Sequence, residues 1–341
     1  IANESRQASL LGRREVLTGK AKFGIFGDGK EVPQLAMARA FQKGDWRSGY
    51  YRDQTFMLAT GMMTLESFFS MLYGTTSLDM NPANGGRMMN NHFGTRCLDA
   101  RGNWLNLAKQ KNSSADISPT AGQMPRALGL ALASKVFREE KNLHKHSQLS
   151  NKGNEVTFAT IGDASTSEGH FFETMNAAAV LGVPLAVSVW DDGYGISVPI
   201  EYQTVKSSIS EALKGFDKQE GDHTGIYIFR EKAWNYAALV EIYQKGIEQC
   251  RREHIPVLFH ITEATQPQGH STSGSHERYK SEERLKWERD NDCILKMRQW
   301  IIDEKIYDTD ELNLIEKKAV ETVKEARRKA WEAYQKPILE S

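Results

Sequence analysis

Short apolar runs and helical patterns alternate along residues 155–264. The apolar runs are rich in β-branched residues, which is typical of strands buried on both faces, and they occur at 155–163, 184–190, 225–230 and 256–264. Helical periodicity fills two of the intervening segments, 167–182 and 235–254. This alternation predicts an α/β fold with three layers, in which a doubly wound, mainly parallel sheet lies between two layers of helices.

The N-terminal part of the chain has weaker patterns. Residues 1–50 are polar with short helical signals, and residues 75–120 contain turn-forming residues throughout. The segment 64–74 places apolar side chains on one helical face and ends in Gly74, which predicts a helix that stops there. The segment 122–140 predicts a buried helix whose small residues allow close packing.

The C-terminal tail is charged and carries one apolar stripe. From about residue 302, apolar side chains recur at helical spacing, at Ile315, Val320, Val323 and Trp331. The final sequence QKPILES then predicts a break in this helix. Two interpretations remain open, a C-terminal helix that packs on the domain or a linker into a following domain or partner.

Composition narrows the class of protein. The chain has 341 residues with 40% hydrophobic content, enough for one large α/β domain or two smaller ones. Lys and Arg total 44, as do Asp and Glu, and the net charge of +0 gives no support to broad binding of nucleic acid or anionic membranes. No apolar run reaches the roughly 20 residues that span a bilayer. The start lacks a secretory signal and the three cysteines show no metal spacing, so a reduced cytoplasmic setting is expected.

Carboxylates stand at the ends of two predicted strands. Asp163 follows Gly162 at the end of one, and Asp191 and Asp192 follow the next. Ligands in doubly wound sheets bind beyond the carboxyl ends of the strands. Gly162 lets the backbone approach a ligand, and the N-terminus of the helix expected to follow suits a phosphate. Asp163 would repel a bare phosphate, but not one that arrives with Mg²⁺.

A bound metal ion explains the aspartate pair. Mg²⁺ takes about six oxygen ligands, commonly one or two carboxylates with phosphates and water. Asp163, Asp192 and a backbone carbonyl near Tyr194 can supply the protein's share, provided that Asp191 turns away. Taken singly, each carboxylate is better explained as a helix cap or a turn residue. Taken together at this spacing, the residues favour a metal site.

The same residues resemble a coenzyme motif. Gly162-Asp163-Ala164, then 26 residues (165–190), then Asp191-Asp192, resembles the thiamin-diphosphate motif, which usually runs from GDG to NN. The whole segment is similar to the alpha chain of the thiamin-diphosphate-dependent decarboxylase that begins 2-oxoacid dehydrogenase complexes, closest to the branched-chain type. Four further segments resemble motifs of this family, in the right order, at 50–53, 85–94, 118–129 and 269–273, the last like a phosphorylatable His-Ser loop.

The resemblance implies a role for each matching residue. Asp163, Asp192 and the carbonyl of Tyr194 would hold Mg²⁺. His270 would stand near the thiazolium ring as the catalytic residue that handles protons, aided by an imidazole that titrates near neutral pH. The loop around Ser271 would order when the coenzyme binds. The remaining coenzyme contacts would come from Tyr51, Arg52, Ser118, Thr120, Gly162, Ala164 and Ser165.

The resemblance also implies the activity and the partners. The expected reaction is oxidative decarboxylation of a 2-oxoacid, with transfer of the acyl fragment to a lipoyl group of a partner acyltransferase. The glutamate that assists the aminopyrimidine would come from a beta chain, in an α2β2 assembly or as a fused domain. The chain would divide into an N-terminal helical arm (1–45), the domain that binds the diphosphate half of the coenzyme (46–300), and a C-terminal helix or linker (301–341).

Two alternatives stay open at this point. The first is another thiamin enzyme, such as a pyruvate or acetoin dehydrogenase alpha chain or a transketolase half. The second is a non-catalytic protein of similar fold that binds Mg²⁺ and phosphate.

Some residues depart from the family pattern or compete with the motif. Asp192 replaces the second Asn, Trp190 and Gln266 stand where the family often has Arg, and Thr120 replaces a larger apolar residue. These departures predict weaker diphosphate binding unless other cations compensate. GDGKE (27–31) resembles the start of the motif, but no strand like that at 155–161 precedes it. This segment therefore predicts a loop turn. Besides His270, His92 and His276 are further candidates, and no role is expected for His144, His146, His223 and His254.

Overall fold

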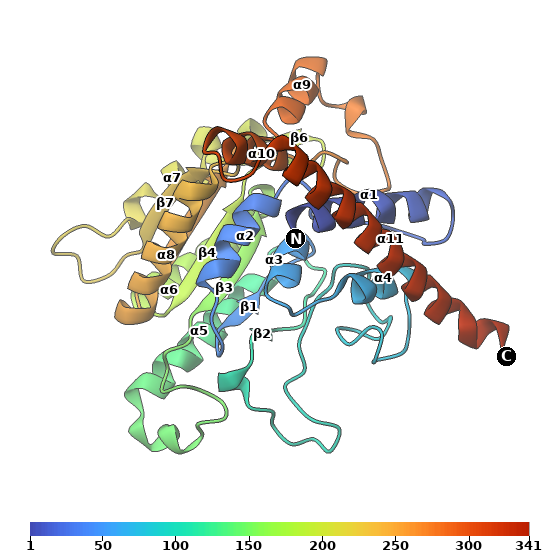
Figure 1. Cartoon of the computed structure of the whole chain (residues 1–341). Coiled ribbons are helices and arrows are strands. Elements are labelled where there is room, and N and C mark those ends of the chain that lie inside the picture. The colour runs from blue at the N-terminus through green and yellow to red at the C-terminus, as the bar shows by residue number, and fades with distance from the viewer. Residues whose placement is uncertain (341) are drawn as a thin grey trace.

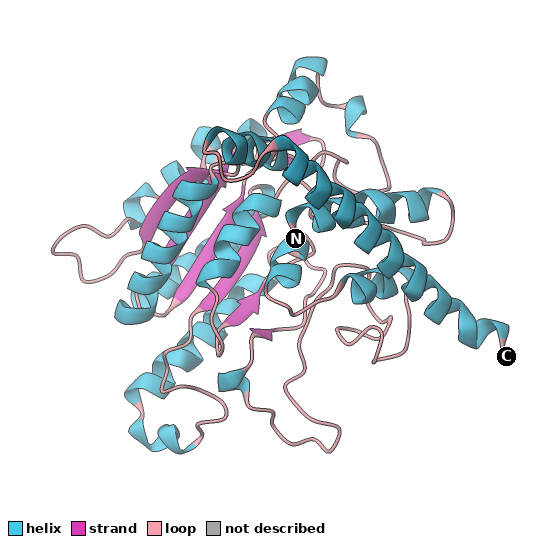
Figure 2. Ribbon diagram, in the orientation of Figure 1, coloured by secondary structure: helices cyan, strands magenta, loops and turns pink. Residues whose placement is uncertain are grey.

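A six-stranded sheet runs through the centre of the chain, and helices cover both of its faces (Figure 1; Figure 2). The computed structural model describes residues 1–340. All neighbouring strands pair in parallel, in the order β2-β1-β3-β4-β8-β7. Their bounds are β1 Trp46–Ser48, β2 Asn112–Ser113, β3 Thr157–Gly162, β4 Leu185–Trp190, β7 Tyr227–Lys232 and β8 Val257–Thr262. This confirms the predicted three-layer α/β fold.

The sheet is buried because its side chains alternate between two helical layers. In β4, Val187 and Val189 point into one core cluster while Ala186 and Trp190 point into the other. The first layer holds α2 and α8, and the second holds α5, α6 and α7 (Figure 1). The bounds of these helices are α2 Glu31–Ala40, α5 Gln123–Glu139, α6 Gly169–Leu181, α7 Ile209–Ala212 and α8 Tyr236–Glu253.

The remaining helices pack on α2 or on one another, except α9, which projects at the top of the view (Figure 1). They are α1 Ala2–Leu17, α3 Gln54–Ala59, α4 Leu65–Tyr73, α9 Glu282–Asp290, α10 Cys293–Asp303 and α11 Thr309–Leu339. The long helix α11 crosses α1 and α4 (Figure 1). As predicted, α4 ends at Gly74, whose φ of 72° is readily adopted by glycine. A short antiparallel hairpin joins β5 Tyr194–Gly195 to β6 Val198–Pro199.

The predicted break of the C-terminal helix is wrong, since α11 continues through Pro337. Proline removes one main-chain donor, but its fixed φ is compatible with a helix. Trp331 and Tyr334, which precede Pro337 in α11, pack on Tyr73 of α4. These contacts hold the helix against α4. The tail packs on the domain as a helix, and its role as a linker stays a prediction. The division of the chain at residues 45 and 300 stays a prediction.

A buried ion-pair cluster ties β1 to the loops on either side of it. The side chain of Arg47 is fully buried. Its Nε donates to Oδ2 of Asp53 at 2.7 Å, and its two terminal nitrogens donate to the carboxylate of Asp116 at 3.0 Å each. Because buried charges are stable only when paired, this cluster fixes the segment that follows β1.

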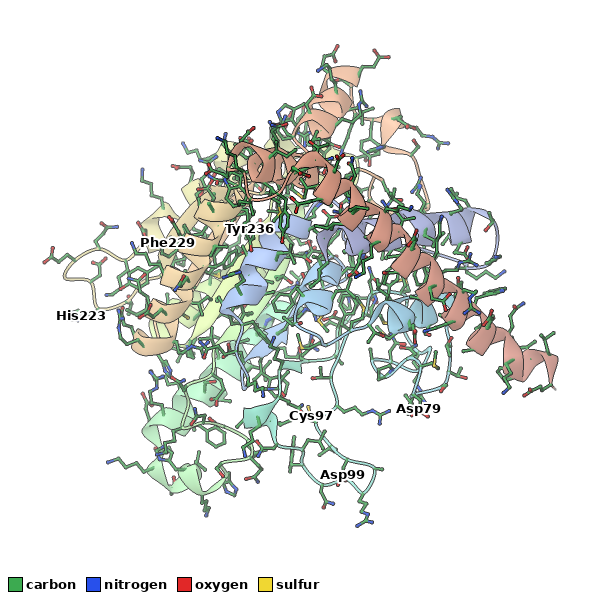
Figure 3. All side chains as sticks on the ribbon, in the orientation of Figure 1. Asp79, Cys97, Asp99, His223, Phe229 and Tyr236 are labelled. Carbon is green, nitrogen blue, oxygen red and sulfur yellow. The ribbon has the colours of Figure 1, made fainter. Side chains whose placement is uncertain are left out.

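The other features give little sign of chemistry. Cys250 and Cys293 are buried and Cys97 is half-buried, all with free thiols as expected. His223, expected to have no role, lies on the projecting loop before β7 (Figure 3). Within residues 1–340, no helix has both the length and the apolar character that crossing a membrane requires.

Acid is expected to weaken the fold through His254, which ends α8. Burial, reinforced by Arg138, lowers the pKa of its imidazole to about 4. The unfolded chain therefore binds a proton that the folded chain rejects between about pH 6.5 and 4, and stability falls as the pH falls through this window. His254 has a φ of 56°, which Asn tolerates. His254→Asn should lose less stability than the wild type between pH 7 and 4.5 in urea unfolding of the unliganded chain. Equal losses would contradict this assignment.

Candidate functional site

A cavity of about 380 Å³ opens beyond the carboxyl ends of β3 and β4. Its wall includes every predicted coenzyme residue except Ser118, namely Tyr51, Arg52, Thr120, Gly162, Asp163, Ala164, Ser165, Asp192, Tyr194 and His270. These residues come from five separate stretches of sequence. The parallel sheet brings them together because the ends of β3 and β4 lie side by side, with Gly162 paired to Trp190.

One carboxylate oxygen of Asp163 is buried without a hydrogen-bond partner among the described residues. This oxygen is Oδ2, and the side chain as a whole is only 4% exposed. Burial, followed by the nearby charges of Asp192 and Asp191, raises the pKa of this carboxyl well above its usual value. A buried carboxylate oxygen without a partner is costly. A cation in the cavity would remove this cost.

The two adjacent aspartates point in different directions. Asp191 is absent from the cavity wall, and its Oδ2 lies 2.8 Å from Nε2 of buried His260. Its Oδ1 accepts the N–H of Gly193 at 2.9 Å. Asp192 faces the cavity, and its Oδ1 accepts the N–H of Tyr194 at 3.2 Å. The side chains are thus arranged as the metal hypothesis requires.

Asp192 also has a partner that the sequence did not predict. Its Oδ2 lies 2.8 Å from Nζ of Lys30. Burial alone would raise the pKa of Asp192, but Lys30, Lys280 and Arg52 together lower it below its usual value. Lys30 belongs to the GDGKE segment, which is a loop turn as predicted but contacts the site. The only indication of this contact in the sequence was the extra negative charge at position 192.

The segment after β3 differs from the prediction. A 3-10 helix occupies Ala164–Ser167, and α6 begins only at Gly169. The hydroxyl and the N–H of Thr166 both bond to the carbonyl of Asp163, which favours a tight turn over an α-helix. The expected helix N-terminus therefore does not directly follow Gly162.

Arg52 fixes the tautomer of the His270 imidazole. One terminal nitrogen of Arg52 donates to the backbone carbonyl of His270 at 3.0 Å and lies 3.1 Å from its Nδ1. Arginine cannot accept a hydrogen bond, so Nδ1 is the acceptor and the neutral ring carries its proton on Nε2. Burial, followed by the charge of Arg52, lowers the pKa of His270 to about 4. The expected titration near neutral pH is therefore wrong for the unliganded chain.

Ser118, His92 and His276 lie outside the cavity wall, whereas Trp190 lines it. His92 is buried between the carbonyl of Asn90, 3.1 Å from its Nδ1, and the hydroxyl of Ser118, 3.2 Å from its Nε2. This contact keeps the Ser118 hydroxyl on His92. His276 is half-buried, and its Nδ1 has no partner among the described residues. Trp190 is buried with its indole N–H 3.4 Å from Asp53.

Comparisons with known proteins support the resemblance. The family described as "Dehydrogenase E1 component" matches residues 10–339. The chain is 27% identical over 289 residues to "2-oxoisovalerate dehydrogenase subunit alpha" of Bacillus subtilis (strain 168), covering 83% of this chain and 74% of that protein. It is 27% identical over 305 residues to "Pyruvate dehydrogenase E1 component subunit alpha" of Acholeplasma laidlawii, covering 88% and 73%.

Some relatives are considerably longer. The chain is 26% identical over 287 residues to "2-oxoisovalerate dehydrogenase subunit alpha 1, mitochondrial" of Arabidopsis thaliana, and these cover 84% of this chain. The match spans only 52% of the length of that relative. Because the family match extends over nearly the whole sequence, the chain belongs to the dehydrogenase E1 component family, and the resemblance to its alpha chains is confirmed.

Proposed function

We propose that this chain is the alpha subunit of an enzyme that oxidatively decarboxylates a branched-chain 2-oxoacid with thiamin diphosphate and Mg²⁺. The family implies dependence on thiamin diphosphate. The observation that carries the proposal is the unpartnered buried oxygen of Asp163 beside Asp192 in the cavity. When bound, the coenzyme supplies the nucleophilic carbon and the electron sink for loss of carbon dioxide.

The residues present fit a magnesium ion held with a diphosphate. Within residues 1–340, no group of three or more His, Cys, Asp and Glu side chains is placed to hold a metal by itself. Mg²⁺ is commonly bound by one or two carboxylates together with phosphate oxygens and water. In the proposal Asp163, Asp192 and the carbonyl of Tyr194 hold the metal.

The remaining wall residues would orient the coenzyme. Arg52 and backbone groups of Gly162, Ala164 and Ser165 would bind the diphosphate, since they line the cavity beside the two carboxylates. The other three proposed coenzyme contacts are Tyr51, Ser118 and Thr120. Ser118 would have to release His92 before it could reach the coenzyme, because its hydroxyl lies on that ring.

His270 is suited to donate a hydrogen bond through its Nε2–H. Its Nδ1 accepts from Arg52, so its Nε2–H is the group left for a bound molecule. The imidazole is neutral near pH 7 because its pKa is lowered to about 4. A neutral ring can donate its Nε2–H as a hydrogen bond to a developing oxyanion without bringing a positive charge close to Arg52.

The cavity has a rim that suits a partner protein. Ile196, Val198, Tyr202 and Val205 are large apolar residues at its mouth or just beyond it, and their side chains are 43–78% exposed. Exposed apolar residues that cluster in this way are typical of an interaction surface. We propose that a beta-type chain covers this rim in an α2β2 assembly, and that a lipoyl-bearing acyltransferase receives the acyl group. A cytoplasmic location stays a prediction.

The chain alone is expected to be inactive. The glutamate that would assist the aminopyrimidine belongs to the beta-type partner in this proposal. Oxidation of 2-oxoacids by an artificial electron acceptor should therefore be measurable with the native assembly, purified from its source cells, and absent with the isolated chain. Full turnover by the isolated chain would contradict the proposed partnership.

Substrate profiling separates branched-chain 2-oxoacids from pyruvate. The relative named as a pyruvate dehydrogenase subunit is as similar in identity as the bacterial 2-oxoisovalerate relative, which keeps pyruvate as the second candidate. A kcat/KM for 2-oxoisovalerate at least tenfold above that for pyruvate supports the first candidate, and the reverse order supports the second. Exchange of the thiazolium C2 proton no faster than in free coenzyme would instead indicate a non-catalytic protein.

A further inference from the structure

Lys30 is a fully buried cation behind the cavity wall, in contact with the wall residues Asp192 and Gln266. Its side chain is about 1% exposed. Its Nζ donates to Oδ2 of Asp192 at 2.8 Å, to the carbonyl of Thr265 at 2.7 Å and to Oε1 of Gln266 at 2.5 Å. An ammonium group has three donors, so these bonds use all of them. Lys30 therefore holds its neighbours in place and has no donor left for a ligand.

The chain places Lys30 through a rigid turn. Gly29 has a φ of 85°, and a Cβ there would lie 2.0 Å from the carbonyl of Thr265, so only glycine permits this close approach. The N–H of Gly29 donates to Oε2 of Glu31 at 2.8 Å. Arg6 of α1 in turn binds Glu31 through Nε at 2.7 Å. The close approach to Thr265 on one side and the hydrogen bond to Glu31 on the other thus fix the turn without any ligand.

Lys30 joins two of the departures from the family pattern. Asp192 brings an extra negative charge where the motif usually has Asn, and Gln266 brings no charge where the family often has Arg. Both side chains accept a hydrogen bond from the same Nζ atom. Lys30 therefore supplies, from another part of the chain, the positive charge that position 266 lacks. Its ammonium lies beside the negative charge added at position 192.

We propose that Lys30 is a positioning residue that balances the charge of Asp192, so that the two act as one neutral unit where the family pattern has an amide. This inference rests on the proposed function. Removing one partner of a buried ion pair leaves an unpaired buried charge, which is strongly destabilising. Replacing both partners with neutral groups is often tolerated. The proposal therefore predicts that two harmful substitutions compensate each other.

Thermal unfolding of the unliganded chain tests the pairing without any coenzyme. Lys30→Met and Asp192→Asn should each lower the unfolding temperature by roughly 5 °C or more, because each leaves one buried charge. The double variant should unfold within about 2 °C of the wild type. Lys232→Met is the control, because Lys232 pairs with Glu263 outside the cavity wall, and it should leave the unfolding temperature unchanged.

Calorimetric titration of thiamin diphosphate with Mg²⁺ into the native assembly tests the effect on the site. Lys30→Met should weaken binding by about tenfold or more, and adding Asp192→Asn should restore it to within about threefold of the wild type. Lys232→Met should bind like the wild type. If Lys30→Met does not fold, the double variant decides: a folded protein that binds supports the proposal, and one that does not fold or bind overturns it.

The outcomes separate the inference from the proposed function. Unchanged unfolding and binding in Lys30→Met would overturn the role of Lys30, as would a double variant no better than Lys30→Met. If the wild-type assembly binds no thiamin diphosphate, the proposed function fails. In that case compensation in the unfolding temperatures still supports the Lys30–Asp192 unit, and its absence overturns it.

Discussion

Asp163→Asn is expected to abolish Mg²⁺-dependent coenzyme binding while making the unliganded chain more stable. The dissociation constant for thiamin diphosphate should rise at least about a hundredfold, since a metal ligand and its charge are lost. Stability should increase by about 1–3 kcal/mol at neutral pH, because the buried Oδ2 has no partner to offset its desolvation. A gain in stability excludes misfolding as the reason for lost binding.

The sign of the stability effect follows from the direction of the pKa shift. Burial, followed by the charges of Asp192 and Asp191, raises the pKa of Asp163 in the folded chain. The folded state therefore favours the protonated form, and stability is lost as the pH rises through the folded pKa. Asn resembles the protonated acid and carries no such penalty. Thermal unfolding at pH 5 and pH 8 should show a smaller loss for Asp163→Asn than for the wild type.

Asp191→Asn provides the matched control from the same aspartate pair. Asp191 binds His260 and the N–H of Gly193, and it is absent from the cavity wall. This substitution should lower stability, yet leave Mg²⁺-dependent coenzyme binding within about threefold of the wild type. Equal loss of binding in Asp163→Asn and Asp191→Asn would contradict the proposed metal site.

His270→Asn is expected to lower kcat by roughly 10²- to 10³-fold, the range for removal of one hydrogen-bond donor to a developing oxyanion. Coenzyme affinity should change by less than about threefold, because in the proposal Arg52 and the two carboxylates carry the diphosphate and metal. His270 lines the cavity with its Nδ1 already on Arg52, so the loss is confined to the Nε2–H. Turnover with an artificial electron acceptor and calorimetric titration measure the two effects separately.

His276→Asn is the control for His270. His276 lies in the same segment before α9 but does not line the cavity. Its substitution should leave kcat within about threefold of the wild type. A His270→Asn assembly with undiminished kcat would remove His270 from the mechanism. An equal loss in both variants would point to disturbance of the segment and not to loss of the Nε2–H donor.

The strands β3, β4, β7 and β8 were predictable from the sequence, and the short strands β1 and β2 were not. β3, β4 and β8 are apolar and buried on both faces, so their own residues indicate them. β1 and β2 have three and two residues, and they carry polar side chains such as Arg47 and Asn112. Their pairing depends on partners far away in the sequence, and no local pattern reports it.

The cavity wall was largely predictable because parallel strands end at one edge of the sheet. Gly162, Asp163 and Asp192 could be placed there from the order of strands alone. Lys30 could not, because its contact with Asp192 spans 162 positions and depends on a glycine turn. The lowered pKa of His270 could not be predicted either, since it is set by burial and by Arg52.

Calorimetric titration of thiamin diphosphate into the native assembly, with Mg²⁺ and then with a chelator in its place, tests the proposed coenzyme site most directly. Saturable binding that disappears with the chelator is the predicted result. Binding of equal strength without a divalent cation would contradict the metal role of Asp163 and Asp192. Absence of binding, in an assembly shown to contain its beta-type partner, would contradict the coenzyme site itself.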